Sequence, residues 1–162
     1  MVAVAVNTET ARLFELLGNV TDPEIPVLSL LDLGVLRDIS VTDGRVNVTI
    51  TPTYAGCPAM EAMRADIEAT LAAAGYTQVV VQQKLSPAWS TDWMTQSGRE
   101  KLRAYGIAPP LSTARGQATG GIECPQCHST DVSRISEFGS TACKALYRCE
   151  DCLEPFDYFK CL

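Results

Sequence analysis

The chain has 162 residues, a length that suits one domain or a compact domain with a small appendage. Its composition, 46% hydrophobic and 20% charged, lies close to the average of globular proteins. No stretch of the sequence approaches the roughly 18 consecutive apolar residues that a membrane-spanning helix needs. Thirteen basic and nineteen acidic side chains give a net charge of −6, which argues against a nucleic-acid backbone as the main partner. We therefore expect a protein that neither enters a membrane nor binds nucleic acid.

Seven cysteines are an odd number, so they do not form a complete disulfide framework. The apolar opening Met1–Val6 is too short for a secretory signal and lacks its basic flank. Both observations indicate a reducing compartment, in which thiols more often bind metal or take part in chemistry. The sequence thus predicts a cytoplasmic protein.

The positions of the cysteines divide the chain. Cys57 stands alone in the first part, whereas the other six lie at or beyond Cys124. Between them lie residues 108–121, which are rich in Pro, Gly, Ser and Thr, carry one charge and show no apolar period. We expect this stretch to be a linker that joins a first domain of residues 1–107 to a second domain of residues 122–162.

The first domain is expected to mix helices with strands. Asp43-Gly44 is a strong turn signal between two runs of alternating apolar residues, so these runs predict a hairpin. Proline is favoured in the first turn of a helix, and Pro58 precedes apolar residues at helical spacing. In chain order the expected elements are a helix over 8–18, strands over 35–41 and 45–51, a helix from Pro58 to Gly75, a strand over 79–81, and a helix that starts near Thr91 and carries Trp93, Met94, Leu102 and Tyr105. This α-β-β-α-β-α order predicts an α+β sandwich with one sheet covered by helices.

The second domain carries two C-x-x-C pairs, Cys124 with Cys127 and Cys149 with Cys152. Two residues between cysteines let a tight turn direct both thiolates to one ion, and two such turns complete the tetrahedron that Zn²⁺ prefers. Short β-type runs surround the second pair, as in a β-rich zinc ribbon. Because this domain is too small for a sizeable core, we expect one structural zinc ion to supply much of its folding free energy.

Other uses of these cysteines leave more of the pattern unexplained. Cys124-x-x-Cys127-His128 also fits haem attachment, but that chemistry needs an exported protein and leaves the second pair unused. A thioredoxin-like redox pair would need a βαβ pattern, which neither pair follows. A rubredoxin-like iron or an iron–sulfur cluster on the same four thiolates stays open, because ligand softness alone does not separate these metals from zinc.

Three further residues of the second domain have no ligand role in this scheme. Cys143 and Cys161 are expected to be small buried residues beside the metal pairs, with an alternative ligand or redox role left open. His128, the only histidine in the chain, is expected to lie at the surface because four thiolates already satisfy zinc.

Cys57 follows a predicted strand and directly precedes the helix that Pro58 opens. This position predicts a cap at the helix start, where unpaired backbone N–H groups and the helix dipole lower the pKa of a thiol. Thr51 and Thr53 lie one strand period apart, so their hydroxyls point to the same face and could donate to a thiolate or to a bound ligand.

The segment Asp22-Pro23-Glu24 precedes Ile25-Pro26 and is expected to form a fixed loop, because proline excludes a regular helix there. Two carboxylates held near a thiolate would make a metal-handling or partner-docking site. A structural alternative stays open, in which Asp22 caps a helix, Glu24 is solvated and Cys57 is simply buried. No histidine is available here as a base, and no phosphate-binding glycine loop is present.

Several motifs together resemble known families. Those of the first domain resemble the MIP-type iron–sulfur assembly domain, and they are Asp22-Pro23-Glu24, Asp32-Leu33-Gly34, Thr51-Pro52-Thr53 and Cys57-Pro58. Further motifs lie later in the chain, and they are Pro87–Thr95, Gly98-Arg99, Lys101-Leu102, Tyr105–Pro110 and the two C-x-x-C pairs. With them, almost the whole chain resembles the accessory proteins of phenylacetate degradation that form part of phenylacetyl-CoA epoxidase (ring-1,2-epoxidase) systems.

This resemblance implies a non-catalytic accessory or maturation factor for a multicomponent monooxygenase of aerobic phenylacetate catabolism. Its implied partners are the iron–sulfur assembly machinery and a client, either the diiron oxygenase component or the reductase component with flavin and a [2Fe–2S] centre. It also implies that iron or an iron–sulfur cluster binds transiently at Cys57, near Asp22, Glu24, Thr51 and Thr53. One histidine cannot supply the Glu-x-x-His pairs of a diiron site, and no flavin or nucleotide fingerprint is present, so the chain is expected to be neither component.

Two functions of other classes stay open. A zinc-ribbon module could bind nucleic acid or protein, but residues 121–162 carry four basic against seven acidic side chains, which is the wrong sign for nucleic acid. A small thiol oxidoreductase using Cys57 would need a resolving cysteine, which only the second domain could supply. The sequence leaves open whether the chain forms a homodimer.

Overall fold

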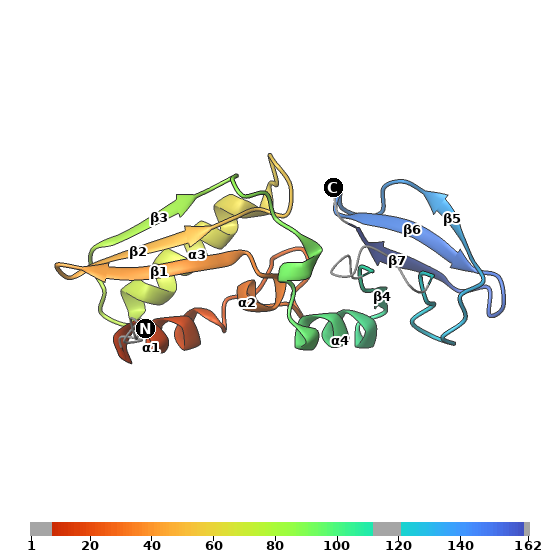
Figure 1. Cartoon of the computed structure of the whole chain (residues 1–162), viewed down its shortest axis with the longest axis horizontal. Helices are drawn as coiled ribbons and strands as arrows, with labels where there is room; N and C mark the ends of the chain where they lie inside the picture. The colour runs from red at the N-terminus through yellow and green to blue at the C-terminus, as the bar shows by residue number, and fades with distance from the viewer. Residues whose placement is uncertain (1–7, 112–120, 161–162) are drawn as a thin grey trace, which may run out of the picture.

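The computed structural model describes residues 8–111 and 121–160 and places them in two β-sheet regions side by side (Figure 1). In the first region, β1 (Leu36–Thr42) pairs antiparallel with β2 (Arg45–Ile50), which pairs in parallel with β3 (Val79–Gln83). The sheet of the second region has the order β4 (Ile107–Ala108), β7 (Pro155–Phe159), β6 (Lys144–Cys149), β5 (Val132–Ser136). The predicted α+β class with a β-rich second region is confirmed.

The hairpin of the first region turns where the sequence indicated. Asp43 and Gly44, between β1 and β2, both have positive φ, 51° and 76°. A two-residue hairpin turn of this kind needs positive φ at both positions, which Asp and Gly tolerate best. The turn therefore sets the pairing of the two strands.

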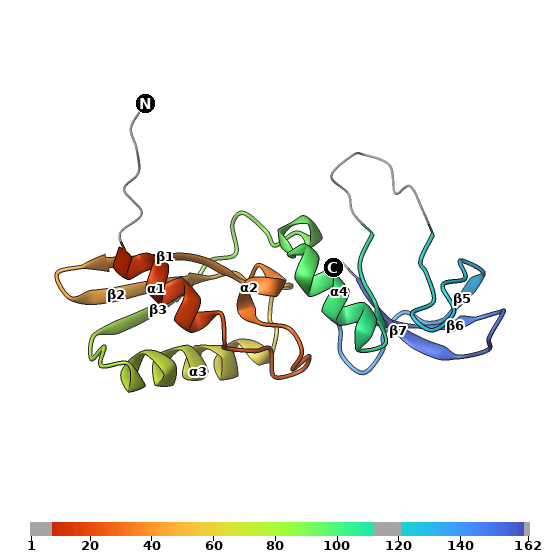
Figure 2. The same cartoon turned by 90° about the horizontal axis from the view of Figure 1, so that it is seen from below.

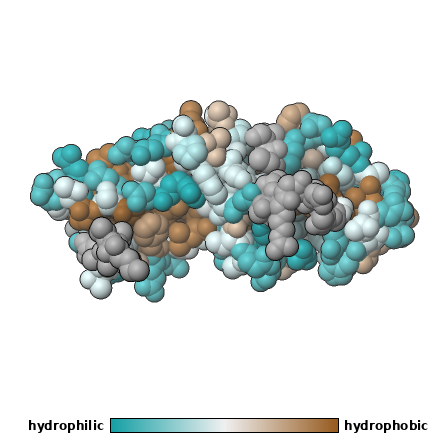
Figure 3. Space-filling model, viewed as in Figure 1, coloured by the Kyte–Doolittle hydropathy of each residue, from teal (hydrophilic) through white to brown (hydrophobic). Residues whose placement is uncertain are grey.

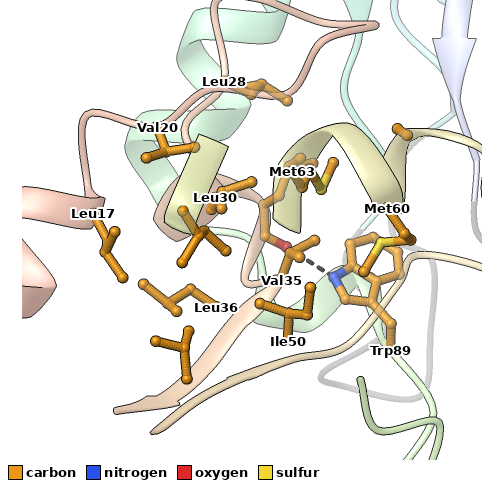
Figure 4. Close-up of a cluster of buried hydrophobic side chains, with 14 of the residues drawn as sticks. Leu17, Val20, Leu28, Leu30, Val35, Leu36, Ile50, Met60, Met63 and Trp89 are labelled. Atoms are coloured by element: carbon orange, nitrogen blue, oxygen red, sulfur yellow. Dashed lines mark hydrogen bonds between the residues drawn. The ribbon is translucent and has the colours of Figure 1, made fainter. Parts of the chain in front are cut away.

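Two helices cover the three-stranded sheet. α1 (Thr8–Leu17) and α3 (Ala59–Ala73) pack against each other and against the strands (Figure 2). Their large buried side chains recur every three or four positions, as a helix with one apolar face requires, and they are Leu13, Leu17, Met60, Met63, Ile67 and Leu71. In Figure 4 these helices and strands form one apolar cluster, in which Met60 lies against the indole ring of Trp89.

The helix expected near Thr91 is divided into two. η1 (Thr91–Trp93) is a single 3₁₀ turn, Met94 is extended (φ −67°, ψ 138°), and α4 (Gln96–Ala104) begins after it. Thr95 explains the break, because its Oγ1 accepts the Gly98 N–H at 2.9 Å and so caps a new helix. The prediction of one continuous helix from Thr91 is therefore wrong.

A short helix that the sequence did not predict, α2 (Leu30–Leu33), is held by Asp32. The Asp32 N–H donates to Ser29 Oγ at 3.1 Å, and the Ser29 N–H donates to Asp32 Oδ2 at 3.1 Å, which together form a capping box. Asp32 also accepts Lys101 Nζ at 2.6 Å and the Thr95 hydroxyl at 3.1 Å. One buried carboxylate thus joins α2 to α4.

Replacing Asp32 by Asn is expected to lower the free energy of unfolding by about 1–3 kcal/mol at neutral pH, because hydrogen bonds to a charged group are lost. Burial alone would raise the pKa of Asp32, but hydrogen bonds from Lys101, Ser29 and Thr95 outweigh it and hold the pKa below its usual value. The ionised carboxylate therefore stabilises the fold above about pH 4, and this contribution is lost as the pH falls through the lowered pKa. Urea unfolding at a series of pH values measures the difference between the two proteins, which should shrink in acid; a difference independent of pH would assign Asp32 to packing alone.

The segment after α4 belongs to the second sheet. β4 pairs in parallel with Asp157 and Tyr158 of β7. Ala108, which was expected to begin the linker, is therefore a strand residue. Arg99 fixes the chain just beyond it by donating to the Pro110 carbonyl at 2.5 Å. The expected linker residues 112–120 lie outside the described part of the chain.

Trp89 connects the two regions. Its indole N–H donates to the Leu33 carbonyl at 2.8 Å (dashed line in Figure 4). Its ring meets the ring of Phe159 edge-on, with centroids 6.0 Å apart and planes at 71°. Phe159 and Cys143 of the second region are buried in the same cluster as the core of the first. The two regions therefore share a core in addition to the chain that joins them.

Hydrophilic residues cover most of the face shown in Figure 3, and hydrophobic residues show between the first sheet and the helices beneath it. Within residues 8–111 and 121–160, no helix combines the length and apolar character needed to cross a membrane.

Candidate functional site

The four cysteines of the two C-x-x-C pairs converge in the second region. All four sulfur atoms lie within 4.8 Å of one another. The Cys124 and Cys152 sulfurs are 3.7 Å apart, and the Cys127 and Cys149 sulfurs are 3.5 Å apart. A tetrahedral zinc ion with Zn–S bonds of about 2.3 Å requires sulfur atoms about 3.8 Å apart. The four residues therefore fit one zinc ion.

The two pairs are built alike. The Cys124 N–H donates to the Ser129 carbonyl at 2.9 Å, and the Cys149 N–H donates to the Glu154 carbonyl at 3.0 Å, so both turns close over the same number of residues. Hydrogen bonds from backbone N–H groups stabilise the Cys149 thiolate and lower its pKa to about 7, and the hydrogen bond from the Cys152 N–H contributes most. The turn of the second pair thus favours the thiolate of Cys149, which is the form that a metal ion binds.

His128 lies outside this set of sulfur atoms. Its side chain is 63% exposed, and its Nδ1 lies 2.6 Å from the Glu123 carboxylate. His128 has a positive φ of 64°, and Leu153, at the matching position after the second pair, has a positive φ of 63°. His128 is therefore a turn residue at the surface, as the sequence predicted.

The apolar core of the second region is small. Its own buried cluster consists of four residues, Ala108, Cys124, Cys149 and Phe156. Two of these are metal-ligand candidates, so little buried surface remains without them. A zinc ion bound by the four thiolates would supply the cross-link that holds both turns together.

Cys57 lies in the loop between β2 and α3. The N-cap of α3 is Pro58 (φ −69°, ψ −20°), so the prediction that Cys57 is the cap is wrong by one position. The thiol nevertheless accepts a hydrogen bond from the Ala59 N–H, one of the free donors of the first turn. The hydroxyl of Tyr54 is its second hydrogen-bond partner.

The electrostatic prediction for Cys57 also needs correction. Burial raises the pKa of the thiol, and the charges of Glu24 and Asp22 add to the increase. Hydrogen bonds from the Ala59 N–H and the Tyr54 hydroxyl act in the opposite direction without compensating. Desolvation thus outweighs the helix start, and the thiol is protonated at neutral pH.

We expect iodoacetamide to alkylate Cys57 more slowly at neutral pH than it alkylates free cysteine, because only the thiolate reacts. Tyr54→Phe should slow the reaction further, since it removes a hydrogen bond that lowers the pKa of Cys57. Peptide mass spectrometry of the zinc-loaded protein gives the rate at each pH. The rate should still be rising at about pH 9; a plateau below about pH 8 would contradict the raised pKa.

Asp22 and Glu24 lie in the loop expected from the sequence, and their charges act on Cys57. Asp22 Oδ1 accepts the Glu24 N–H at 2.6 Å and the Ile25 N–H at 2.9 Å, which folds the segment into a turn. The Asp22 side chain is buried by this turn, whereas Glu24 is half-buried. Both charges act on Cys57 and favour its protonated form, so the two carboxylates belong to the electrostatic environment of the thiol.

Thr51 and Thr53 line a cavity of about 230 Å³ together with Tyr54 and Trp89. Thr51 is buried and Thr53 is half-buried. The hydroxyl that hydrogen-bonds to Cys57 is that of Tyr54, which therefore borders both the cavity and the thiol. The two threonines and the thiol belong to one loop and lie on either side of this tyrosine in the sequence.

Sequence reasoning missed two residues of this neighbourhood. Tyr54 stands inside the Thr51–Pro58 motif, but a single loop tyrosine carries no periodic signal. Cys143 comes from the second region, and its closeness depends on the contact between Trp89 and Phe159, which no spacing in the sequence reveals.

Comparison with known proteins gives matches in both regions. Residues 10–82 match a family model described as an iron–sulfur cluster assembly protein, and residues 108–160 match the PaaD zinc beta ribbon domain. An Escherichia coli K12 protein with the provisional name of a 1,2-phenylacetyl-CoA epoxidase subunit is 48% identical over 152 residues, or 93% of this chain and 92% of that protein. An Fe-S protein maturation auxiliary factor of Porphyromonas gingivalis is 34% identical over 89 residues, or 54% of this chain and 84% of that protein.

Among solved structures, a domain of unknown function from Bacillus anthracis, DUF59, resembles the first region. The likeness covers 57% of this chain and 90% of that chain, with a TM-score of 0.54 and 24% identity. It supports the fold of the first region alone.

Proposed function

Since the chain belongs to the PaaD family of phenylacetyl-CoA epoxidase subunits, in which an iron–sulfur assembly domain is followed by a zinc ribbon, we propose that it is a maturation factor for the epoxidase. It delivers iron or an iron–sulfur cluster to the oxygenase or the reductase component. It catalyses no step of the epoxidation, and it acts in the cytoplasm together with the iron–sulfur assembly machinery.

The observation that carries the proposal is the group formed by Cys57, Asp22 and Glu24. Thiolates and carboxylates are both ligands for iron, and thiolates are the usual ligands of iron–sulfur clusters. In the described residues, only the four cysteines of the second region bring three or more ligand atoms within 4.8 Å of one another. Cys57 and Glu24 are half-buried, so solvent reaches the thiol, which suits a residue that accepts a cargo and releases it.

The two regions take different parts in this proposal. The first region, which runs to the end of α4, holds the cargo at Cys57. The second region, whose sheet includes β4, holds zinc at Cys124, Cys127, Cys149 and Cys152 and stays closed. The single histidine supports the accessory role, because His128 lies at the surface beside Glu123 and cannot build a diiron site.

The test compares the oxygenase and reductase components purified from cells with and without this protein, grown on a neutral carbon source while the epoxidase genes are induced. We expect equal amounts of both polypeptides, and at least tenfold less iron in one of them when the protein is absent. Iron is measured by elemental analysis, and the [2Fe–2S] centre by its visible absorption. Fully metallated, active components from cells that lack the protein would overturn the proposal.

A further inference from the structure

The four cysteines of the two C-x-x-C pairs, which we call the metal set, differ in their exposure to solvent. Cys124 and Cys149 are fully buried, with 0% of each residue exposed, whereas Cys127 and Cys152 are exposed. A bound zinc ion keeps all four as thiolates, and the thiolates that solvent reaches are the cysteines most readily oxidised. An oxidant in solution therefore meets two of the four ligands directly.

Each exposed sulfur of the metal set lies next to a buried sulfur of the other pair. The Cys127 sulfur is 3.5 Å from that of Cys149, and the Cys152 sulfur is 3.7 Å from that of Cys124. A cysteine that is oxidised to a sulfenic acid forms a disulfide when a second thiolate is within reach. Because a disulfide bond is about 2.05 Å long, a small shift of the side chains joins either pair. The arrangement thus supplies each exposed cysteine with a partner for a disulfide.

β7 links the metal set to the first region. Phe156, near the start of the strand, belongs to the small buried cluster that contains the two buried ligands. Phe159, at the end of the strand, is buried in the core of the first region, where its ring contacts Trp89. Trp89 in turn lines a cavity together with Tyr54, in the loop between β2 and α3. One strand therefore contributes an aromatic ring to the core beside the metal and another to the core beside this loop.

We propose that the metal set is also a site of oxidative modification and acts as a redox switch. Hydrogen peroxide converts it to the disulfides Cys127–Cys149 and Cys124–Cys152, and the contact of the second region with the first then loosens. In each step peroxide oxidises the exposed thiolate to a sulfenic acid, and the neighbouring buried thiolate attacks the sulfenic sulfur. Two thiolates, one peroxide molecule and two protons give one disulfide and two water molecules. Each disulfide removes two zinc ligands, so two peroxide molecules suffice to release the zinc ion.

The loosening follows from the small size of the buried cluster in the second region. Two disulfides keep the turns connected, but they stabilise a folded domain less than a bound zinc ion does. The cluster cannot compensate, because two of its four buried residues are themselves cysteines of the metal set. Since the disulfides hold the cysteines together, a thiol reductant restores the thiolates for a new zinc ion. The switch needs no iron cargo and is independent of the proposed function.

The test treats the zinc-saturated full chain with an excess of hydrogen peroxide, stops the reaction with catalase, and measures free zinc with a chelating dye. We expect release of one zinc per chain, the disulfides Cys127–Cys149 and Cys124–Cys152 by peptide mass spectrometry, and renewed zinc binding after reduction. Cys161→Ala is the matched control, because it removes a thiol of the second region outside the metal set, and it should release zinc at the rate of the unaltered chain. Zinc that stays bound, disulfides that join other cysteines, or oxidation that a reductant does not reverse would overturn the inference.

A second measurement follows the contact between the two regions. Hydrogen exchange in β6 and β7 should be at least tenfold faster in the oxidised chain than in the zinc-bound chain, and exchange in α3 should be unchanged. The chain has two tryptophans, so a Trp93→Phe variant leaves Trp89 as the single fluorophore. Its emission should shift to longer wavelength on oxidation and return on reduction with zinc, because the Phe159 ring no longer shields the indole. Unchanged exchange in β7, or unchanged emission of Trp89, would overturn the switch.

Discussion

Replacing Cys149 by Ser is expected to release zinc and to unfold the second region, while α1, α3 and the three-stranded sheet stay folded. Cys149 is fully buried and is one of four sulfur atoms that fit a single zinc ion. A serine hydroxyl is a much poorer zinc ligand than a thiolate. Zinc contributes about 10–16 kcal/mol of folding free energy in small zinc domains, and the buried cluster of this region has no other source of that size.

Elemental analysis should give one zinc per chain for the unaltered protein and about a tenth of that or less for Cys149→Ser. Hydrogen exchange measured by mass spectrometry should show loss of protection in β5, β6 and β7 and unchanged protection in α3. His128→Asn is the matched control, because the exposed His128 side chain lies beside the turn of the first pair and contributes no ligand to the metal set, and asparagine tolerates its positive φ. Full zinc content in Cys149→Ser, or zinc loss in His128→Asn, would contradict the assignment.

Replacing Cys57 by Ala is expected to abolish support of the epoxidase in cells while fold and zinc survive. The loss of the hydrogen bond from the Ala59 N–H should lower the free energy of unfolding by only about 1 kcal/mol, as at other helix starts. Zinc should remain because its ligands are four other cysteines in the second region. Function should be lost because no other soft ligand lies in the loop between β2 and α3.

Cys57→Ser separates the chemistry of sulfur from its packing. Serine is close to cysteine in size and can accept the same hydrogen bond from the backbone N–H. We therefore expect this variant to be as stable as the unaltered protein but to lose its function. Growth on phenylacetate, the iron content of both components and the melting temperature are measured for each variant. Normal growth with either variant would show that Cys57 is a packing residue and would exclude iron transfer at this thiol.

The elements that depend on neighbours in the sequence could be predicted. Asp43-Gly44 determines its hairpin through its own backbone preferences, and α3 follows from apolar residues at helical spacing. The spacing of each C-x-x-C pair defines its turn in the same way, so all four sulfur atoms of the metal set could be named in advance.

The features that depend on contacts between distant segments could not be predicted from the sequence. α2 and the break before α4 arise from hydrogen bonds of Asp32 and Thr95 that join the two helices. The pKa of Cys57 is raised by burial, whereas the sequence shows only its place beside a helix start. Cys143 reaches the first region through the pairing of β6 with β7 and the contact of Phe159 with Trp89.

The most direct measurement of cargo transfer loads the zinc-saturated protein with radioactive iron and mixes it, without oxygen, with iron-free oxygenase and reductase components. A chelator that captures free iron is present, and the radioactivity of each component is counted after separation. We expect iron to enter one component at least tenfold faster than from the same concentration of free Fe(II), and Cys57→Ser to remove this advantage. Transfer no faster than from free Fe(II), or equally fast with Cys57→Ser, would contradict delivery of iron by this protein.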